Sequence, residues 1–252
     1  MKILVSFALD AEFAPWRKQR EFHCIAREPY RMYEAAMGAY TLRIVLTGAG
    51  PEPARRAMEA TLEHAPYLCI SSGLAGGLKP MHRPGEILVA RTVGELSGGP
   101  AISSDETLLA AAVDHGAKTV ESFLTSPTLA QTAEDKCGMG AIADAVEMES
   151  FPVLAACRER GIPAVAIRAV SDAAETDLPY RFERALDEQG RIHVPRLLAQ
   201  VARRPQRIPA LVQFARQSRR AAAALAQFLD VYVGSLAAQM NTYEWESPVA
   251  AT

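Results

Sequence analysis

Acidic side chains follow apolar stretches at three places in this 252-residue chain, and these carboxylates are well suited to acid–base chemistry. The three places are residues 10–12, 147–149 and 171–172. A carboxyl group at the end of a buried strand is partly desolvated, and desolvation raises its pKa toward values useful to a general acid or base. A simpler interpretation stays open for each, because acids also cap helices and favour their first turns.

Two glycine-rich segments, 48–50 and 73–77, stand at similar positions after apolar stretches. Ligands of open α/β sheets bind outside the carboxyl ends of the strands, so both segments are candidates for the floor of a binding site. Neither has the spacing of a dinucleotide-binding fingerprint or a P-loop. The five histidines lack metal-binding spacing and no G-x-S-x-G motif is present, so we expect neither a metal site nor a serine hydrolase.

The elements that must position these residues alternate between strands and helices. Short apolar runs predict strands at residues 3–8, 33–39, 41–47, 67–72, 86–90, 119–125, 141–147 and 164–170. Start and stop signals predict helices at residues 10–20, 54–64, 105–115 and 149–160. This order predicts an α/β fold with a mixed or mainly parallel sheet and helices on both faces.

The overall composition is that of a globular protein, with 49% hydrophobic and 22% charged residues. The net charge of −2 gives no reason to expect nucleic acid as a partner. The four cysteines lack C-x-x-C spacing and are interpreted as reduced thiols. The first apolar run is too short for a signal peptide, and none approaches the ~20 residues of a spanning helix. We therefore expect a cytoplasmic protein.

The stretch between Gln189 and Phe228 differs from the rest of the chain, because it contains no Asp, Glu or Lys. Its charged residues are eight arginines: Arg191, Arg196, Arg203, Arg204, Arg207, Arg216, Arg219 and Arg220. The sequence predicts three parts, namely one α/β domain at 1–190, an Arg-rich helical extension packed on it at 191–240, and a flexible tail at 241–252.

Six segments of the chain, taken together and in this order, resemble the purine nucleoside phosphorylase and nucleosidase superfamily. The likeness is to 5′-methylthioadenosine/S-adenosylhomocysteine nucleosidases and to hopanoid-associated nucleoside phosphorylases. The segments are ALDAE at 8–12, TGAG at 47–50, SGLAGGL at 72–78, GEILV at 85–89, AVEME at 145–149 and RAVSDA at 168–173. The resemblance covers residues 1 to about 190 and implies a three-layer α/β/α fold with a central mixed sheet, followed here by the helical extension.

The resemblance implies a mechanism for cleaving the bond between a purine and ribose. The sugar passes through a state with oxocarbenium character, and the base leaves readily only when it is protonated. Asp172 would protonate the base at N7 and would therefore stay protonated near neutral pH, with Ser171 holding it in place. Glu149 would accept hydrogen bonds from the ribose hydroxyls, and Met148 would pack against the sugar. Glu12 would orient and deprotonate an attacking water.

Further residues of the binding site follow from the same resemblance. Arg168 would organise the polar pocket, Gly73 would line it, and Leu129 stands where nucleosidases have an aromatic residue that grips the base. Leu74 and Ser71 replace residues that contact the nucleophile or phosphate in relatives. No cofactor is expected, and both water and inorganic phosphate stay open as the nucleophile.

The resemblance therefore predicts an enzyme that acts on a purine nucleoside, expected to be a 5′-substituted adenine nucleoside. One alternative is a phosphorylase of an adenosylhopane-type lipid nucleoside, since the basic extension resembles that of the hopanoid-associated members. A second is a non-catalytic nucleoside-binding protein, and a third is a peripheral membrane module. The extension would either lie on an anionic membrane or form a helical hairpin packed on the core or on a subunit. Relatives imply a homodimer or larger homo-oligomer.

Overall fold

A computed structural model describes residues 2–63, 65–185, 187, 190 and 193–242. Its strands are β1 (Lys2–Phe7), β2 (His23–Ala26), β3 (Arg31–Met37), β4 (Tyr40–Leu46), β5 (Leu68–Gly77), β6 (Ile87–Glu95), β7 (Ile102–Ser103), β8 (Lys118–Thr125), β9 (Ala145–Glu147) and β10 (Ala164–Asp172). Its α-helices are α1 (Asp10–Gln19), α2 (Pro51–Thr61), α3 (Glu106–Asp114), α4 (Ala133–Met139), α5 (Ser150–Glu159), α6 (Val194–Arg203) and α7 (Ile208–Thr242). Two short 3₁₀ turns are η1 (Phe182–Ala185) and η2 (Pro205–Arg207).

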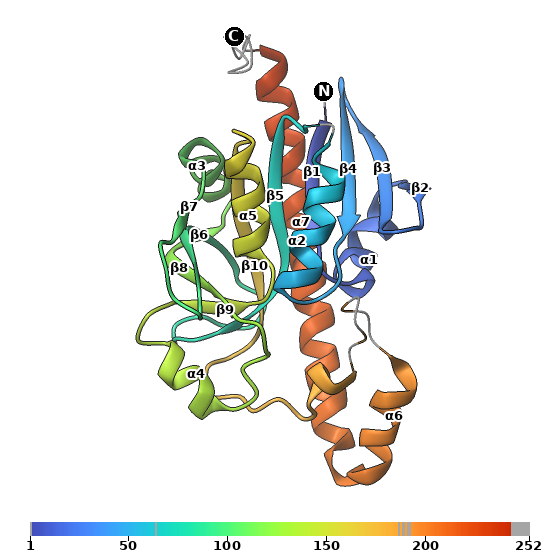
Figure 1. Ribbon diagram of the computed structural model, residues 1–252, viewed down its shortest axis with the longest axis vertical. Coiled ribbons are helices and arrows are strands. Elements are labelled where there is room, and N and C mark those ends of the chain that lie inside the picture. Colours follow the sequence, from blue (N-terminus) through green and yellow to red (C-terminus); the bar gives the residue numbers. More distant parts are fainter. Residues whose placement is uncertain (1, 64, 186, 188–189, 191–192, 243–252) are drawn as a thin grey trace.

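The strands form one mixed sheet in the order β10-β6-β8-β9-β5-β1-β4-β3-β2, and β7 pairs with β6 (Figure 1). Strand β10 also pairs with β5, so β5, β10, β6, β8 and β9 close into a ring. Strands β4, β1, β5 and β10 run parallel to one another, which brings their carboxyl ends to the same edge. Because of this ring, Gly76 in β5 has β10 on one side and β9 on the other.

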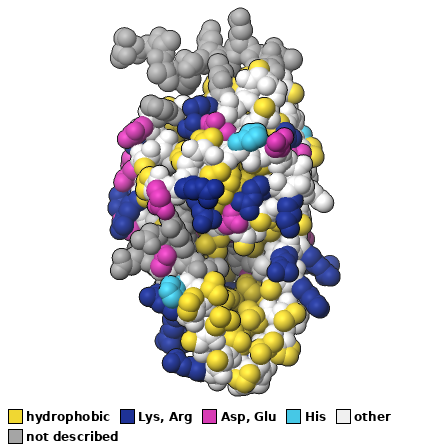
Figure 2. Space-filling model, turned by 90° about the vertical axis from the view of Figure 1, so that its right-hand side faces the viewer, with side chains coloured by type: hydrophobic (Ala, Val, Ile, Leu, Met, Phe, Trp, Pro, Cys, Tyr) yellow, Lys and Arg dark blue, Asp and Glu magenta, His cyan; other side chains and the backbone are white. Residues whose placement is uncertain are grey.

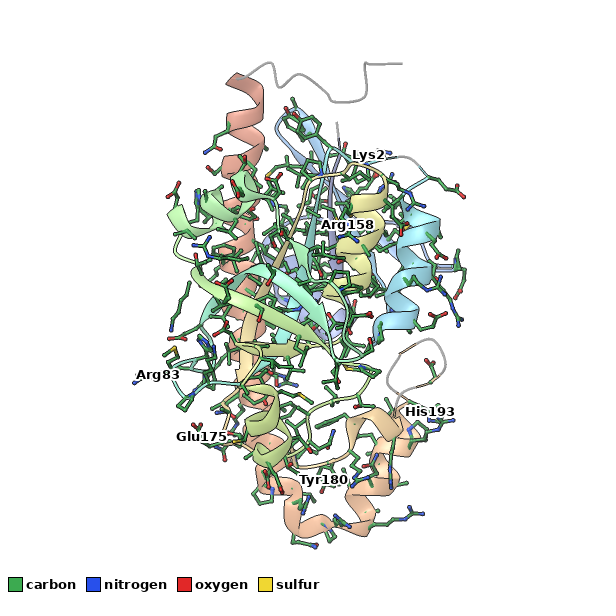
Figure 3. The ribbon with its side chains drawn as sticks, turned by 60° about the vertical axis from the view of Figure 1, so that its left-hand side comes forward. Lys2, Arg83, Arg158, Glu175, Tyr180 and His193 are labelled. Atoms are coloured by element: carbon green, nitrogen blue, oxygen red, sulfur yellow. The ribbon has the colours of Figure 1, made fainter. Side chains whose placement is uncertain are left out.

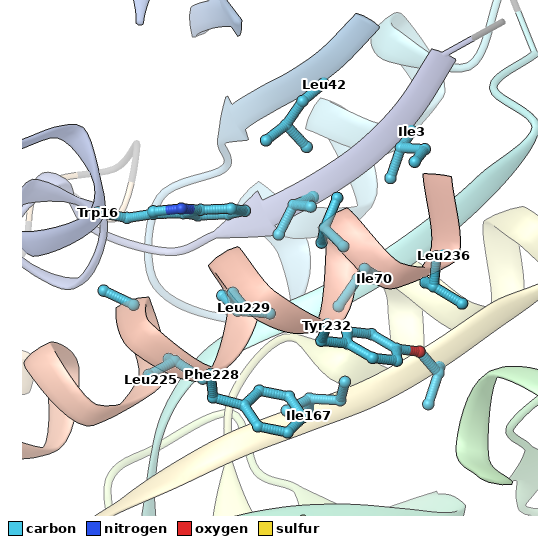
Figure 4. Packing of buried hydrophobic residues seen from close by; sticks show 14 of the residues in the cluster. Ile3, Trp16, Leu42, Ile70, Ile167, Leu225, Phe228, Leu229, Tyr232 and Leu236 are labelled. Atoms are coloured by element: carbon cyan, nitrogen blue, oxygen red, sulfur yellow. The ribbon is translucent and has the colours of Figure 1, made fainter. Parts of the chain in front are cut away.

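Side chains alternate between the two faces of the sheet, as expected for buried strands. In β1, Ile3, Val5 and Phe7 belong to one hydrophobic cluster, whereas Leu4 belongs to another on the opposite face. Helices α1, α3 and α7 cover the first face, and α2 and α5 cover the second (Figures 1 and 4). The result is a helix–sheet–helix layering around a mixed sheet, as the sequence predicts.

The long helix α7 divides into two halves with different surroundings. Its second half, residues 221–237, supplies nine buried side chains to the cluster on the α1 face, among them Leu229 and Tyr232 (Figure 4). Asp230 accepts hydrogen bonds from Trp16 Nε1 and Arg20 Nε at 2.9 Å each, which fastens α7 to α1. The helix is long and apolar enough to cross a membrane, but 56% of its apolar window is buried. This half of α7 is therefore a core helix.

The structure differs from the sequence-based expectations in several local features. Strands β2 and β7 and helix α4 were not predicted, and β9 is shorter than the predicted strand at 141–147. The glycines at 73–77 lie within β5, because both neighbouring strands pair with this stretch. Leu9, and not Asp10, is the N-cap of α1, and Asp10 pairs with Arg17. Most of the predicted tail, residues 243–252, lies outside the described residues.

Candidate active site

The candidate site lies at the carboxyl edge of the parallel strands. Figure 3 places Lys2, where β1 begins, at the end of the molecule opposite to Glu175 and Tyr180, which follow β10 along the chain. Five polar segments meet at this edge: residues 10–12, 48–50, 73–77, 147–149 and 171–172. The sequence predicted that these segments would lie at one edge of a sheet, and the strand registers confirm that expectation.

Asp172 is the last residue of β10 and is only 5% exposed. Its backbone pairs with Gly76, whose missing side chain leaves room, since a Cβ there would lie 3.3 Å from Asp172 Oδ2. The Ser171 hydroxyl donates to Asp172 Oδ1 and also lies 3.1 Å from the carbonyl oxygen of Ala75. Ser171 therefore fixes one oxygen of the carboxyl group.

The other carboxyl oxygen of Asp172 is held by a residue that the sequence reasoning missed. Lys136 on α4 is fully buried, and its Nζ forms an ion pair with Asp172 Oδ2. The same ammonium donates to the carbonyl oxygens of Ala173 at 2.9 Å and Thr176 at 2.8 Å. A buried lysine with all three hydrogens engaged keeps its charge at an acceptable cost, because each hydrogen has an acceptor. Asp172 thus has a proton-bearing group in direct contact.

The sequence contains a pattern that indicates the start of the helix carrying Lys136. Thr132 and Asp135 form a reciprocal capping box, in which the threonine hydroxyl accepts from the Asp135 N–H and the aspartate accepts from the Thr132 N–H. This pattern marks a helix start, and it places Lys136 in the first turns of α4. Its meeting with Asp172, 36 residues away in the chain, is a tertiary contact that spacing does not reveal.

Arg168 is the centre of a second buried cluster. Its guanidinium is fully buried and its Nη2 donates to Glu147 Oε2 at 2.6 Å. The same nitrogen lies 3.7 Å from Glu149 Oε2 and 3.3 Å from Ser71 Oγ. Ser71 Oγ also lies 3.2 Å from Ser150 Oγ. Because Ser71 is fully buried in these contacts, it supports Arg168 and is not open to a phosphate ion.

Glu147 and Glu149 have different surroundings although both stand at the start of α5. Glu147 Oε2 accepts from the backbone N–H groups of Glu149 at 2.9 Å and Ser150 at 2.7 Å, so it is held at the helix N-terminus. Glu149 turns away from the helix and accepts from the Gly50 N–H at 2.8 Å. Burial, together with the nearby Glu147 charge, raises the pKa of Glu149 to about 8. Glu149 therefore retains a proton near neutral pH.

Glu12 reaches across from α1 to β5. Its Oε2 accepts from the N–H groups of Ala8 and Leu9 at 3.0 Å each, and its Oε1 accepts from the Leu74 N–H at 2.9 Å. Burial raises the pKa of Glu12, although these N–H groups and Arg168 oppose the shift. Gly73 is required beside it, since a Cβ at this position would lie 3.0 Å from Glu12 Oε1. The side chain is held rigidly and is a stronger base than an exposed glutamate.

The remaining sequence-predicted residues lie at the margins of this arrangement. Met148 is buried, and its methyl group lies 3.9 Å from where a Cβ on Gly50 would stand, so it packs on the glycine turn beside Glu149. Leu129 is half-buried in the loop between β8 and α4. That loop leads into α4, the helix that carries Lys136.

A cleft of about 260 Å³ adjoins this edge, lined by Ala8, Leu9, Asp10, Ala11, Arg31, Leu46 and Gly48. It borders both the start of α1 and the turn that binds Glu149. Asp172 and Glu149 do not line it, and both are almost completely buried. A ligand as large as a purine nucleoside therefore reaches them only if side chains at this edge rearrange. Among the described residues, no group of three His, Cys, Asp or Glu side chains is placed to hold a metal ion.

Comparison with known proteins agrees with the fold. Three similar solved structures are the futalosine hydrolase of Helicobacter pylori (TM-score 0.73, 18% identity), a mutant of the H. pylori 5′-methylthioadenosine/S-adenosylhomocysteine nucleosidase with 5′-methylthioadenosine in its active site (0.72, 17%), and the corresponding Neisseria meningitidis nucleosidase with methylthio-immucillin-A (0.71, 21%). Each alignment covers 93% of this chain and 98–99% of the other. At these identities the likeness establishes the fold. A family model described as the phosphorylase superfamily matches residues 2–204, and the chain therefore belongs to the phosphorylase superfamily.

Proposed function

We propose that this protein cleaves the N-glycosidic bond of a purine nucleoside, with Asp172 delivering a proton to the departing base. The observation that carries the proposal is the convergence of three carboxyl groups at one edge of the sheet, namely the buried Asp172 and Glu149 and the half-buried Glu12. Each is held in a different way, which suits three different tasks. Two solved nucleosidases of the same fold hold a methylthioadenosine or an analogue of it, which supports a nucleoside as the ligand class.

The proton for the base would come from the pair formed by Asp172 and Lys136. As the bond to ribose breaks, its electron pair moves into the purine ring, and N7 takes a proton from Asp172. That proton reaches Asp172 from the Lys136 ammonium in contact with its carboxylate, so the transfer leaves a neutral lysine amine and an unprotonated Asp172. The base leaves neutral, and the pair regains one proton from solvent after the product departs. General acid catalysis of this kind contributes typically ~10²–10⁴-fold to the rate.

Glu149 and Glu12 would act on the other side of the scissile bond. Glu149 faces the Gly50 turn and would bind the ribose hydroxyls, with Met148 against the sugar. Glu12 would take a proton from an attacking water, a task that suits its raised pKa. The cleft beside Leu9 and Gly48 would receive the 5′ substituent. The presence of Glu12, a carboxyl group suited to activating water, favours water over phosphate as the nucleophile.

The direct test is incubation of the full chain with adenosine, 5′-methylthioadenosine and futalosine, each with and without inorganic phosphate. Chromatography for free base, the free sugar and its 1-phosphate then identifies the nucleophile. We expect base release that does not require phosphate. Asp172→Asn should lower kcat by at least ~10²-fold, whereas the exposed control Asp114→Asn should not. Failure to cleave any purine nucleoside under either condition would reject the proposal.

A second candidate is an adenosylhopane-type lipid nucleoside, whose bulky apolar 5′ group distinguishes it from methylthioadenosine. The exposed apolar and basic hairpin formed by α6, η2 and the start of α7 favours this candidate. Competition with a nucleoside that carries a long alkyl chain at the 5′ position tests it. Tight binding of adenine or nucleoside without turnover would instead identify a non-catalytic binding protein. Light scattering of the purified chain tests the expected homo-oligomer.

A further inference from the structure

The C-terminal hairpin exposes an apolar face with no covering element among the described residues. Helix α6 contributes no buried residue, although its apolar side chains fall on one side. Val194 is 57% exposed and Leu198, one turn later, is 60% exposed. Ile208 and Val212, at the start of α7, are each 42% exposed. We call residues 194–220 the tail hairpin, and Figure 2 shows its apolar side chains gathered into one patch at the end of the molecule.

Basic side chains surround this patch, and acidic side chains are missing from the sequence of the tail hairpin. Its seven arginines are Arg196, Arg203, Arg204, Arg207, Arg216, Arg219 and Arg220. Figure 2 shows Lys and Arg side chains along the margins of the apolar patch. An apolar face bordered by positive charge is the pattern of a helix that lies in the interface of an anionic bilayer.

We propose that the tail hairpin docks the protein on the surface of an anionic lipid membrane. Insertion of Val194, Leu198, Ile208 and Val212 into the boundary between headgroups and acyl chains would remove them from water, and the arginines would contact lipid phosphates. The protein would dock on the membrane surface and would not span the bilayer with α7, because the second half of this helix is part of the protein core. This proposal stands independently of the proposed function, since it rests on the hairpin alone.

A second copy of the chain fits this face less well than a membrane does. The commonest dimers are two-fold symmetric, and a two-fold contact centred on this hairpin would place it against the same hairpin of the partner. Such a contact would bring two sets of seven arginines together with no acidic residue from either hairpin to pair with them. Like charges at an interface cost free energy, and burying them costs more. The phosphates of a nucleic acid would pair with the arginines of the hairpin, but the apolar patch would stay exposed to water.

The tail hairpin is tied to the candidate site by the chain segment that follows Asp172. Tyr180 donates its hydroxyl to the carbonyl oxygen of Arg204 at 2.8 Å, and Arg207 Nη1 donates to the carbonyl oxygen of Pro179 at 3.1 Å. Figure 3 places Tyr180 beside the hairpin, with His193 at the start of α6. The Ala49 N–H donates to the Gly190 carbonyl at 2.9 Å, which joins the chain just before the hairpin to the glycine turn. A docked hairpin would therefore hold the site close to the bilayer surface.

The test is sedimentation of the full-length protein with lipid vesicles. We expect partition onto vesicles of phosphatidylcholine with 30% phosphatidylglycerol, weak binding to pure phosphatidylcholine, and loss of binding as salt rises. One variant removes four arginines of the hairpin by substitution with Gln: Arg203, Arg204, Arg219 and Arg220. Its matched control removes four exposed arginines elsewhere: Arg83, Arg91, Arg158 and Arg160. The hairpin variant should bind at least ~100-fold more weakly, since each basic residue contributes about fivefold, and the control should retain most of its affinity.

An apolar pair of variants completes the test. Leu198→Ser with Val194→Ser should weaken binding about tenfold or more, whereas Met81→Ser with Ile142→Ser, equally exposed elsewhere, should not. Circular dichroism confirms that each variant is folded. The proposal is overturned if the wild-type protein does not bind anionic vesicles at low salt, or if hairpin and control variants lose affinity equally. Self-association abolished by the Leu198 substitution, without vesicle binding, would assign the face to a second copy instead.

Discussion

At the residue scale, the proposed reaction would draw the proton for the departing base from the contact between Asp172 and Lys136. A carboxyl group alone in a buried site would have to be neutral to act as an acid. Here the ammonium of Lys136 lies against Asp172 and is also bound by two carbonyl groups, so the pair can hold one proton without an uncompensated charge. In the proposed reaction, Asp172 would donate directly to the base and Lys136 would store the proton.

Replacing Lys136 with methionine tests this division of tasks. We expect kcat to fall by at least ~10²-fold, because the proton source is removed, and the high-pH limb of the kcat profile to move. The exposed control Lys118→Met should leave kcat unchanged. If Lys136 only positions the loop that carries Ala173 and Thr176, the variant would raise KM and lower stability while the pH profile of kcat stays in place.

Glu149 makes the stability of the protein depend on pH. Its pKa rises from the usual 4.5 to about 8 on folding, so the folded chain retains a proton that the unfolded chain releases between roughly pH 4.5 and 8. The free energy of unfolding therefore falls as pH rises through this window. Glu149→Gln removes the titrating group, so this variant should gain stability relative to wild type between pH 5 and pH 8, by at least about 1 kcal/mol. Urea unfolding at the two pH values measures the change, and parallel losses in both proteins would contradict it.

At the scale of elements, Gly190 connects the chain leading to the hairpin with the turn that binds Glu149. Its φ is +69°, and a Cβ there would lie 2.3 Å from the Ala49 carbonyl oxygen. Gly190→Ala should break the hydrogen bond to Ala49 and cost about 1–3 kcal/mol. Gly116→Ala is the matched control, since Gly116 also has positive φ but no atom within 4 Å of a Cβ. Equal losses of unfolding free energy in the two variants would show that the contact with Ala49 contributes nothing.

The helices and strands also show which features of the fold can be predicted from the sequence alone. Apolar runs located the main strands, and the polar segments that follow them do meet at one edge, because parallel strands place their carboxyl ends together. Helix α4 escaped prediction because residues 131–140 lack apolar periodicity. The ring closed by β10 and β5 could not be foreseen, since pairing between distant strands depends on tertiary packing. For this reason Lys136, as a partner of Asp172, and the partners of Arg168 emerged only with the structure.

At the scale of the whole molecule, the second half of α7 stabilises the sheet that carries the site. Leu229 is fully buried in the cluster shared with β1 and α1. Leu229→Ala should lower the free energy of unfolding by ~2–5 kcal/mol, whereas Val231→Ala, at a position 61% exposed, should change it by less than about 0.5 kcal/mol. Thermal unfolding of the two variants provides the comparison. A small effect at Leu229 would mean that α7 is an accessory to the fold and not part of its core.

Because α7 is one continuous helix, the orientation of its first half about the helix axis is fixed relative to its second half. Residues 221–237 are fixed against the sheet, and residues 208–220 extend from them without a break. Each residue added to an α-helix turns everything beyond it by about 100°. A single alanine inserted after Arg220 would keep the composition of the hairpin but swing its apolar patch a quarter-turn around the helix axis. The direction in which the protein presents that patch is thus encoded in the phase of one helix.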